Sequence, residues 1–202
     1  MASGPLVVGL GGSAGPESTS GALLRDALRR VQACGARTVA FDGERLAALP
    51  IFNPHDALPG PVGDELLEAV RRADALVIAT PGYHGGMSGL VKNALDHLEL
   101  LRDDARPYLD GRAVGIIVAT SGWQSCGTAL VAVRSAVHAL RGWPTPFGLT
   151  VNTAEQAIDD DRVRGGMAVL TAQLMAFTAW RAAAEREAAR RTPARTEREV
   201  TR

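Results

Sequence analysis

The sequence has little lysine and little cysteine, and its charges cancel. Lys92 is the only lysine among 22 basic residues, and 22 acidic residues bring the formal net charge to zero. Because a nucleic-acid binder needs a basic face, this balance argues against that class. Cys34 and Cys126 show no metal-ligand spacing, and a lone pair does not indicate a disulfide framework. We therefore predict no metal site and two reduced, packed thiols.

Long apolar runs are also missing. No stretch approaches the roughly 18 apolar residues of a membrane span, and no charged segment followed by a long apolar core stands at the N-terminus. We therefore expect no membrane association and a cytoplasmic location. At 202 residues, 46% of them hydrophobic, the chain is typical of one domain with a substantial core. We place this domain at residues 1–187, and the Arg/Glu/Thr-rich tail at 188–202 is predicted to be disordered.

Short apolar runs alternate with segments of helical apolar spacing. Strands are predicted at 5–10, 38–41, 75–80, 113–120 and 146–151, and helices at 18–33, 61–72, 88–101, 125–141 and 160–187. The proline-rich stretch at 44–60 is expected to be irregular. This alternation predicts an α/β protein whose parallel sheet is covered by helices on both faces. Five strands match a flavodoxin-like three-layer fold with strand order 2-1-3-4-5, which binds ligands between strands 1 and 3.

That topology brings together three loops, at 11–20, 81–89 and 120–127, all rich in Gly, Ser and Thr. The first loop places hydroxyls directly before a helix, at Ser13, Ser18, Thr19 and Ser20. A helix N-terminus with such donors suits a phosphate group. No Lys or Arg lies in this loop, so neutral donors and the helix end would hold the phosphate. Alternatively, Ser18 or Ser20 only caps the helix.

The second loop is opened by glycines and carries two rings. Gly82, Gly85 and Gly86 leave the backbone free to approach a flat ligand, and Tyr83 and His84 can pack beside it. We therefore predict a binding loop for a planar molecule. His84 could equally be an ordinary turn residue exposed to solvent.

Two other motifs overlap the first loop. Residues 9–14 satisfy the dinucleotide pattern G-x-G-x-x-A, with Asp42 available to bind a ribose, although Pro16 delays the helix. Residues 11–15 satisfy the nucleophile-elbow pattern G-x-S-x-G, although only one strand precedes it. Both readings remain as alternatives.

The segment Thr80-Pro81-Gly82-Tyr83-His84-Gly85, continued by Ser88 to Asp96, resembles the signature of the NAD(P)H-dependent FMN reductase family. The Gly-Ser and Ser-x-Ser pattern at 12, 13, 18 and 20 resembles that family's phosphate loop. The resemblance covers roughly residues 5–150. This chain departs from it at Ala14-Gly15-Pro16, where many members carry an arginine, and at Gly82 and His84, where many have Glu and Asn.

The resemblance implies a set of FMN contacts. Ser13, Ser18, Thr19 and Ser20 would hold the phosphate. The isoalloxazine ring would be contacted by Pro81, Gly82, Tyr83, His84, Gly85 and Gly86, and bordered from the third loop by Ser121, Gly122 and Trp123.

The resemblance further implies hydride transfer from NADPH or NADH to FMN, with no dedicated catalytic residue because the flavin does the chemistry. The enzyme would be a flavin reductase, with a flavin-dependent monooxygenase as the partner receiving reduced flavin, or an FMN-containing quinone or azo-compound reductase. A non-catalytic electron carrier is a third reading, disfavoured because such carriers are usually acidic. A homo-oligomer, dimer or tetramer, is expected.

Overall fold

The centre of the protein is a sheet of parallel strands. The computed structural model describes residues 4–15, 17–56 and 58–191. Neighbouring strands follow the order β2-β1-β3-β5-β6. Val7 of the first strand pairs with Thr38 on one side and Ala75 on the other. The four main strands are β1 (Leu6–Gly11), β2 (Arg37–Phe41), β3 (Ala75–Tyr83) and β5 (Ala113–Thr120).

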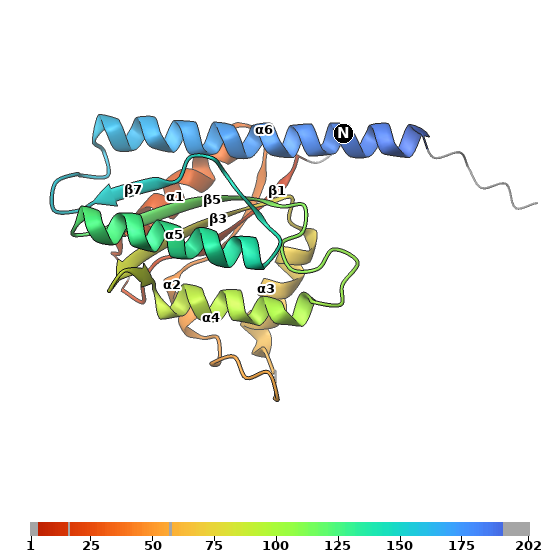
Figure 1. Cartoon of the computed structure of the whole chain (residues 1–202), viewed down its shortest axis with the longest axis horizontal. Helices are drawn as coiled ribbons and strands as arrows, with labels where there is room; N and C mark the ends of the chain where they lie inside the picture. The colour runs from red at the N-terminus through yellow and green to blue at the C-terminus, as the bar shows by residue number, and fades with distance from the viewer. Residues whose placement is uncertain (1–3, 16, 57, 192–202) are drawn as a thin grey trace, which may run out of the picture.

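Helices cover both faces of this sheet (Figure 1). Successive strand residues point to opposite faces, so Val7 packs into one apolar cluster and Val8 into the other. The cluster around Val7 is closed by α1 (Thr19–Ala33) and α6 (Asp161–Arg191). The cluster around Val8 is closed by α2 (Gly43–Ala47), α3 (Gly60–Arg72), α4 (Gly89–His97) and α5 (Trp123–Ala139). The predicted three-layer flavodoxin-like class is therefore confirmed.

Within the described residues the sheet has seven strands, six parallel and one antiparallel, instead of the five parallel strands predicted. The expected strand at 146–151 consists of two pieces, β6 (Trp143–Pro144) and β7 (Leu149–Asn152), both parallel to β5. Pro144 and Pro146 have no N–H to donate to a ladder, so the edge strand is interrupted between them and Leu149. The other addition is β4 (Gly86–Met87), which pairs antiparallel with the end of β3.

Several boundaries also differ from the sequence expectation. The short helix α2 lies inside the stretch expected to be irregular, and Asp42 caps it by accepting the N–H of Arg45 at 3.1 Å. The helix expected at 88–101 is α4 followed by a 3₁₀ turn at Leu98–Leu101. Helix α6 continues past Ala188 to Arg191, and residues 192–202 of the predicted tail lie outside the described residues. Both cysteines are free, but Cys34 is exposed and only Cys126 is buried.

At the end of the sheet away from the three loops, Arg112 is almost completely buried at the start of the β5 region. Its guanidinium donates to the carbonyl oxygens of Arg71, Ala73, Tyr108 and Asp110 at 2.9 to 3.3 Å. Burial lowers the pKa of Arg112 to about 10. The contacts fasten the C-terminus of α3 to the turn before β5.

In the described part of the chain, no helix has the length and apolarity to cross a membrane.

Candidate functional site

The three loops predicted to converge lie next to one another, because β1, β3 and β5 are adjacent and parallel. Their backbones approach so closely that side chains are excluded. The N–H of Gly12 donates to the carbonyl of Ala79 at 3.0 Å. A Cβ on Gly82 would lie 2.3 Å from Cγ2 of Thr120. The glycines at these positions therefore permit the loops to pack directly on each other.

In the first loop, Ser18 is the N-cap of α1. Its Oγ accepts the N–H of Gly21 at 3.0 Å and the N–H of Ser13 at 3.3 Å. The capping interpretation is therefore confirmed for Ser18, and the same contact closes the loop. Ser20 is 2% exposed, and within the described residues its hydroxyl has no hydrogen-bond partner. A buried hydroxyl with no partner in the protein is an available donor for a ligand.

A cavity of about 320 Å³, here called the Ser18 cavity, opens between this loop and the start of α2. Arg25 lines it from α1, seven residues after Ser18 and so on the same helix face. In the described residues the side chain of Arg25 makes no hydrogen bond or ion pair. Sequence reasoning found only neutral donors in the loop and missed this cation, which the two-turn spacing from Ser18 could have revealed. The lining comprises Ser13, Ala14, Gly15, Ser18, Gly21, Arg25, Asp42, Gly43 and Glu44.

A second cavity of about 490 Å³, here called the Tyr83 cavity, lies on the other side of the first loop. No charged side chain lines it, in contrast to the Ser18 cavity. Ser13 and Ala14 line both cavities, which therefore adjoin. The lining comprises Ser13, Ala14, Ala47, Leu49, Ile51, Tyr83, Ser88, Gly89, Leu90 and Asn93.

The rest of the second loop forms a tight hairpin. Gly82 pairs with Met87 and Tyr83 with Gly86, which leaves His84 and Gly85 as the two turn residues. Both have positive φ, 51° and 82°, as a type I′ turn requires. His84 is exposed. Of the predicted ring contacts only Tyr83 lines the Tyr83 cavity, and the structure places the predicted residues Pro81, Gly82, His84, Gly85 and Gly86 outside both cavity linings.

The third loop starts α5 but lines neither cavity. Gly122 is the N-cap of α5 and Trp123 its first residue. The Trp123 ring is 49% exposed, and its indole N–H donates to Oε2 of Glu155 at 2.9 Å. The indole is thereby held against the turn that follows β7. The structure thus brings Ser13, Ser18 and Tyr83 together and leaves Ser121, Gly122 and Trp123 to one side.

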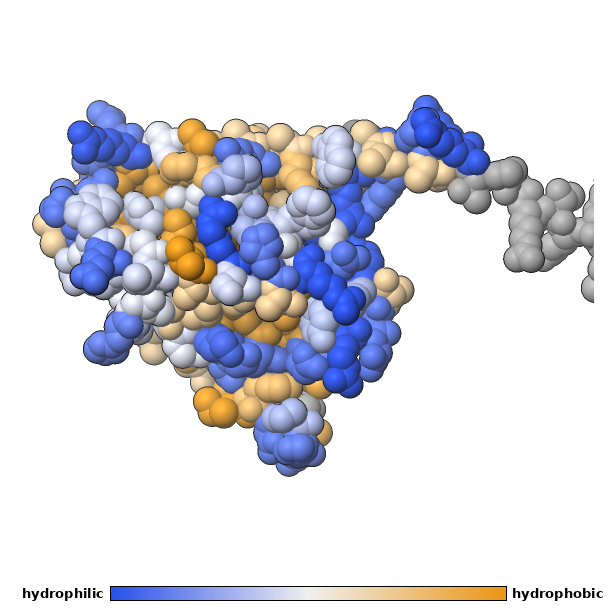
Figure 2. Space-filling model, viewed as in Figure 1, coloured by the Kyte–Doolittle hydropathy of each residue, from blue (hydrophilic) through white to orange (hydrophobic). Residues whose placement is uncertain are grey.

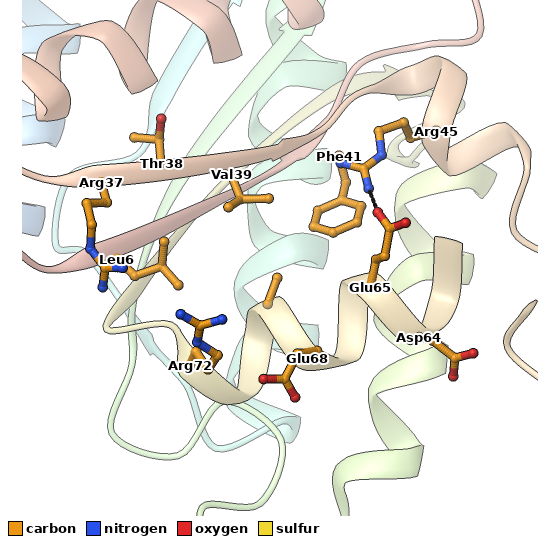
Figure 3. A pocket seen from close by; sticks show the side chains of 11 residues that line it. Leu6, Arg37, Thr38, Val39, Phe41, Arg45, Asp64, Glu65, Glu68 and Arg72 are labelled. Atoms are coloured by element: carbon orange, nitrogen blue, oxygen red, sulfur yellow. Dashed lines mark hydrogen bonds and ion pairs between the residues drawn. The ribbon is translucent and has the colours of Figure 1, made fainter. Parts of the chain in front are cut away.

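A further hollow of about 610 Å³ lies elsewhere, along the edge strand β2 and beside α3 (Figure 3). Leu6, Val39 and Phe41 form its apolar floor. Arg45 lies over the Phe41 ring at 4.1 Å, pairs with Glu65 and donates to the carbonyl of Ala40 at 2.8 Å. Charged side chains on an edge strand discourage pairing with another chain. No residue of the three loops lines this hollow, so we do not take it as the site.

Hydrophobic side chains reach the surface close to the Tyr83 cavity. Figure 2 shows them below α4, where the segment after α2 runs. Ile51 in this segment is 84% exposed. Tyr83, which lines the same cavity, is 54% exposed. The uncharged cavity is therefore bordered by one exposed aliphatic side chain and one exposed aromatic side chain.

Comparisons with known proteins identify relatives. The family model described as NADPH-dependent FMN reductase matches residues 5–156. An FMN-dependent NADPH-azoreductase of Staphylococcus aureus is 34% identical over 97 residues, which are 48% of this chain and 48% of that protein. The match thus spans about half the length of the curated relatives.

Solved structures share the fold at lower identity. An oxidoreductase from Corynebacterium diphtheriae superposes with a TM-score of 0.74 at 16% identity, covering 89% of this chain and 99% of that one. An NADH:FMN oxidoreductase gives 0.64 at 22% identity, covering 87% and 89%. A flavodoxin mutant from Pseudomonas aeruginosa gives 0.57 at 19% identity, covering 84% and 98%.

Proposed function

The chain belongs to the family of NADPH-dependent FMN reductases, and from this membership we propose that it binds FMN and reduces it with NADPH or NADH. The observation that carries the proposal is the pair of adjoining cavities. One is lined by hydroxyls and Arg25, and the other is uncharged and contains Tyr83. FMN has the same division, with a phosphate at one end and an uncharged ring system at the other.

The residues at the phosphate end fit this ligand. The Ser18 oxygen already accepts two N–H groups, so its own hydroxyl hydrogen is free to be donated to a phosphate oxygen. Ser13 lines the same cavity from the loop, whereas Thr19 and Ser20, the first residues of α1, line neither cavity. We assign Thr19 and Ser20 to the phosphate because unpaired N–H groups at the start of a helix favour an anion. Arg25 adds a full positive charge, which offsets one of the two carboxylates, Asp42 and Glu44, on the same cavity.

At the ring end we assign the loop from Pro81 to Gly86, with Tyr83 beside the ring. The backbone N–H groups near Gly85 and Gly86 would stabilise negative charge on a reduced flavin. Ser121, Gly122 and Trp123 would border the ring from the third loop, and Trp123 would have to turn from Glu155 to do so. When bound, FMN supplies the hydride chemistry, and the protein supplies binding and orientation.

The electron acceptor has two candidates. The first is free flavin, with a flavin-dependent monooxygenase as the partner that consumes it. The second is an azo compound or quinone, favoured by the similarity to the FMN-dependent NADPH-azoreductase of S. aureus. Steady-state NADPH oxidation separates them: stimulation by excess free FMN supports the first, and dependence on added quinone or azo dye supports the second. We further propose a cytoplasmic homo-oligomer, with residues 1–187 as one domain.

The binding proposal is tested by titrating the purified protein with FMN and following flavin fluorescence. We expect saturable quenching, weakened in Tyr83→Ala and in Ser18→Ala. An unchanged affinity in both variants would discredit the residues assigned, and no binding by the wild type would refute the function itself.

A further inference from the structure

Two side chains of α4 hold a distant stretch of irregular backbone. The amide oxygen of Asn93 accepts the N–H of Phe52 at 2.9 Å, and its nitrogen donates to the carbonyl of Pro50 at 2.9 Å. One turn further along, Nε2 of His97 lies 3.0 Å from the same carbonyl. Because a carbonyl only accepts, Nε2 carries the proton in this contact. The His97 ring also meets the Phe52 ring edge-on at 5.5 Å.

The stretch held in this way is one wall of the Tyr83 cavity. Leu49 and Ile51 line the cavity on either side of Pro50, and Asn93 lines it as well. The stretch belongs to no helix or strand, so side chains of α4 take over the backbone bonding that a sheet neighbour would otherwise provide. Ile51 is 84% exposed and has little packing of its own to fix it. Its position therefore depends on the contacts made by Pro50 and Phe52.

Both side chains are buried, which supports a structural role for their contact with the Pro50–Phe52 backbone. Asn93 is 8% exposed and His97 is 1% exposed. In the described residues, Nδ1 of His97 is buried without a hydrogen-bond partner. A buried polar atom without a partner destabilises the fold, so a Leu at position 97 would suit stability as well as His does. The distinctive contribution of His97 is the Nε2–H donated to Pro50.

We propose that Asn93 and His97 are positioning residues for the flavin ring: they fix Leu49–Phe52 as the wall against which the ring lies opposite the first loop. The inference rests on the proposed function. It assigns ring recognition to this wall and phosphate recognition to the Ser18 cavity, so the two can be measured separately.

The experiment compares FMN with lumiflavin, which has the ring but no phosphate. We expect Asn93→Ala and His97→Leu to raise the Kd of both ligands by the same factor, about tenfold, because the lost hydrogen bonds free the wall. His97→Gln carries an N–H donor of similar reach and should stay within about threefold of the wild type. Ile51→Ala trims the wall at an exposed position, cannot unfold the protein, and should weaken both ligands.

Matched controls separate positioning from general damage. Lys92→Ala removes an exposed ion pair with Asp96 on the same helix and should leave both Kd values unchanged. Arg25→Ala should weaken FMN alone. Hydrogen exchange at the Phe52 amide, which donates to Asn93, should accelerate in Asn93→Ala without flavin present.

The outcomes are distinct. If the wild type binds neither flavin, the proposed function fails and the ring assignment fails with it. If the wild type binds both, while folded Asn93→Ala, His97→Leu and Ile51→Ala bind lumiflavin as the wild type does, the positioning role alone is overturned.

Discussion

Replacing Gly82 by Ala tests whether the close packing of the second and third loops is required. The added Cβ would lie 2.3 Å from Cγ2 of Thr120, more than 1 Å inside the normal separation of about 3.5 to 4.0 Å between carbon atoms. Thr120 cannot turn away freely. Its Oγ1 donates to the carbonyl of Gly122 at 2.7 Å, accepts the N–H of Gly122 at 3.1 Å and lies 3.1 Å from Sγ of Cys126.

The loops must therefore separate, and overpacking of this kind costs about 1–3 kcal/mol of the free energy of unfolding. Thr120→Ser removes the opposing methyl group but keeps the hydroxyl, and alone it costs about 1 kcal/mol. In the Thr120→Ser background, the nearest remaining atom is Cβ of Ala129 at 3.3 Å. Gly82→Ala should then cost much less than it does in the wild type.

Urea denaturation of the four proteins in this double-mutant cycle measures the coupling, which we expect to exceed about 1 kcal/mol. Gly165→Ala is the matched control, because no atom lies within 4 Å of its added Cβ and Ala favours a helix by about 0.5–1 kcal/mol over Gly. Equal costs of Gly82→Ala in both backgrounds would refute the reasoning.

Three further predictions concern the site and its scaffold. Arg25→Ala should weaken FMN binding about tenfold at low salt and less at high salt, measured by fluorescence titration, because a charge-assisted contact is lost and salt screens it. Ser18→Ala should lower the free energy of unfolding by about 1 kcal/mol, seen as a lower midpoint in urea, because α1 loses its cap. Arg112→Met should lower stability by several kcal/mol (about 3) by removing the donor that four carbonyls share, while the folded fraction binds FMN normally.

The sheet and its order could be predicted from local patterns. Runs such as Leu6 to Leu10 are buried on both faces, so they are apolar throughout, and glycines mark where they end. The broken edge strand could not be predicted in the same way. Pro144 and Pro146 interrupt a strand only where the N–H that proline lacks would have bonded to β5. The local sequence does not show which backbone groups of this segment face β5.

The hydroxyls and glycines of the site could also be predicted from the sequence, because they lie together in short loops. Arg25 was missed because it lies two turns inside an amphipathic helix, where only its spacing from Ser18 indicates that it faces the loop. The contact of Asn93 with Pro50 joins residues 43 apart. Nothing near either residue in the sequence signals it, because it arises only when α4 packs beside the segment after α2. Trp123 was expected beside the ring, and its bond to Glu155 depends likewise on tertiary structure.

The central claim is that this chain holds FMN and reduces it with a nicotinamide. The most direct measurement adds NADPH to the FMN-loaded protein under anaerobic conditions and follows the visible absorption of the flavin. The account predicts that the flavin band bleaches with one equivalent of NADPH or NADH per bound FMN. A protein that retains no FMN, or bound FMN that neither nucleotide bleaches, would contradict it.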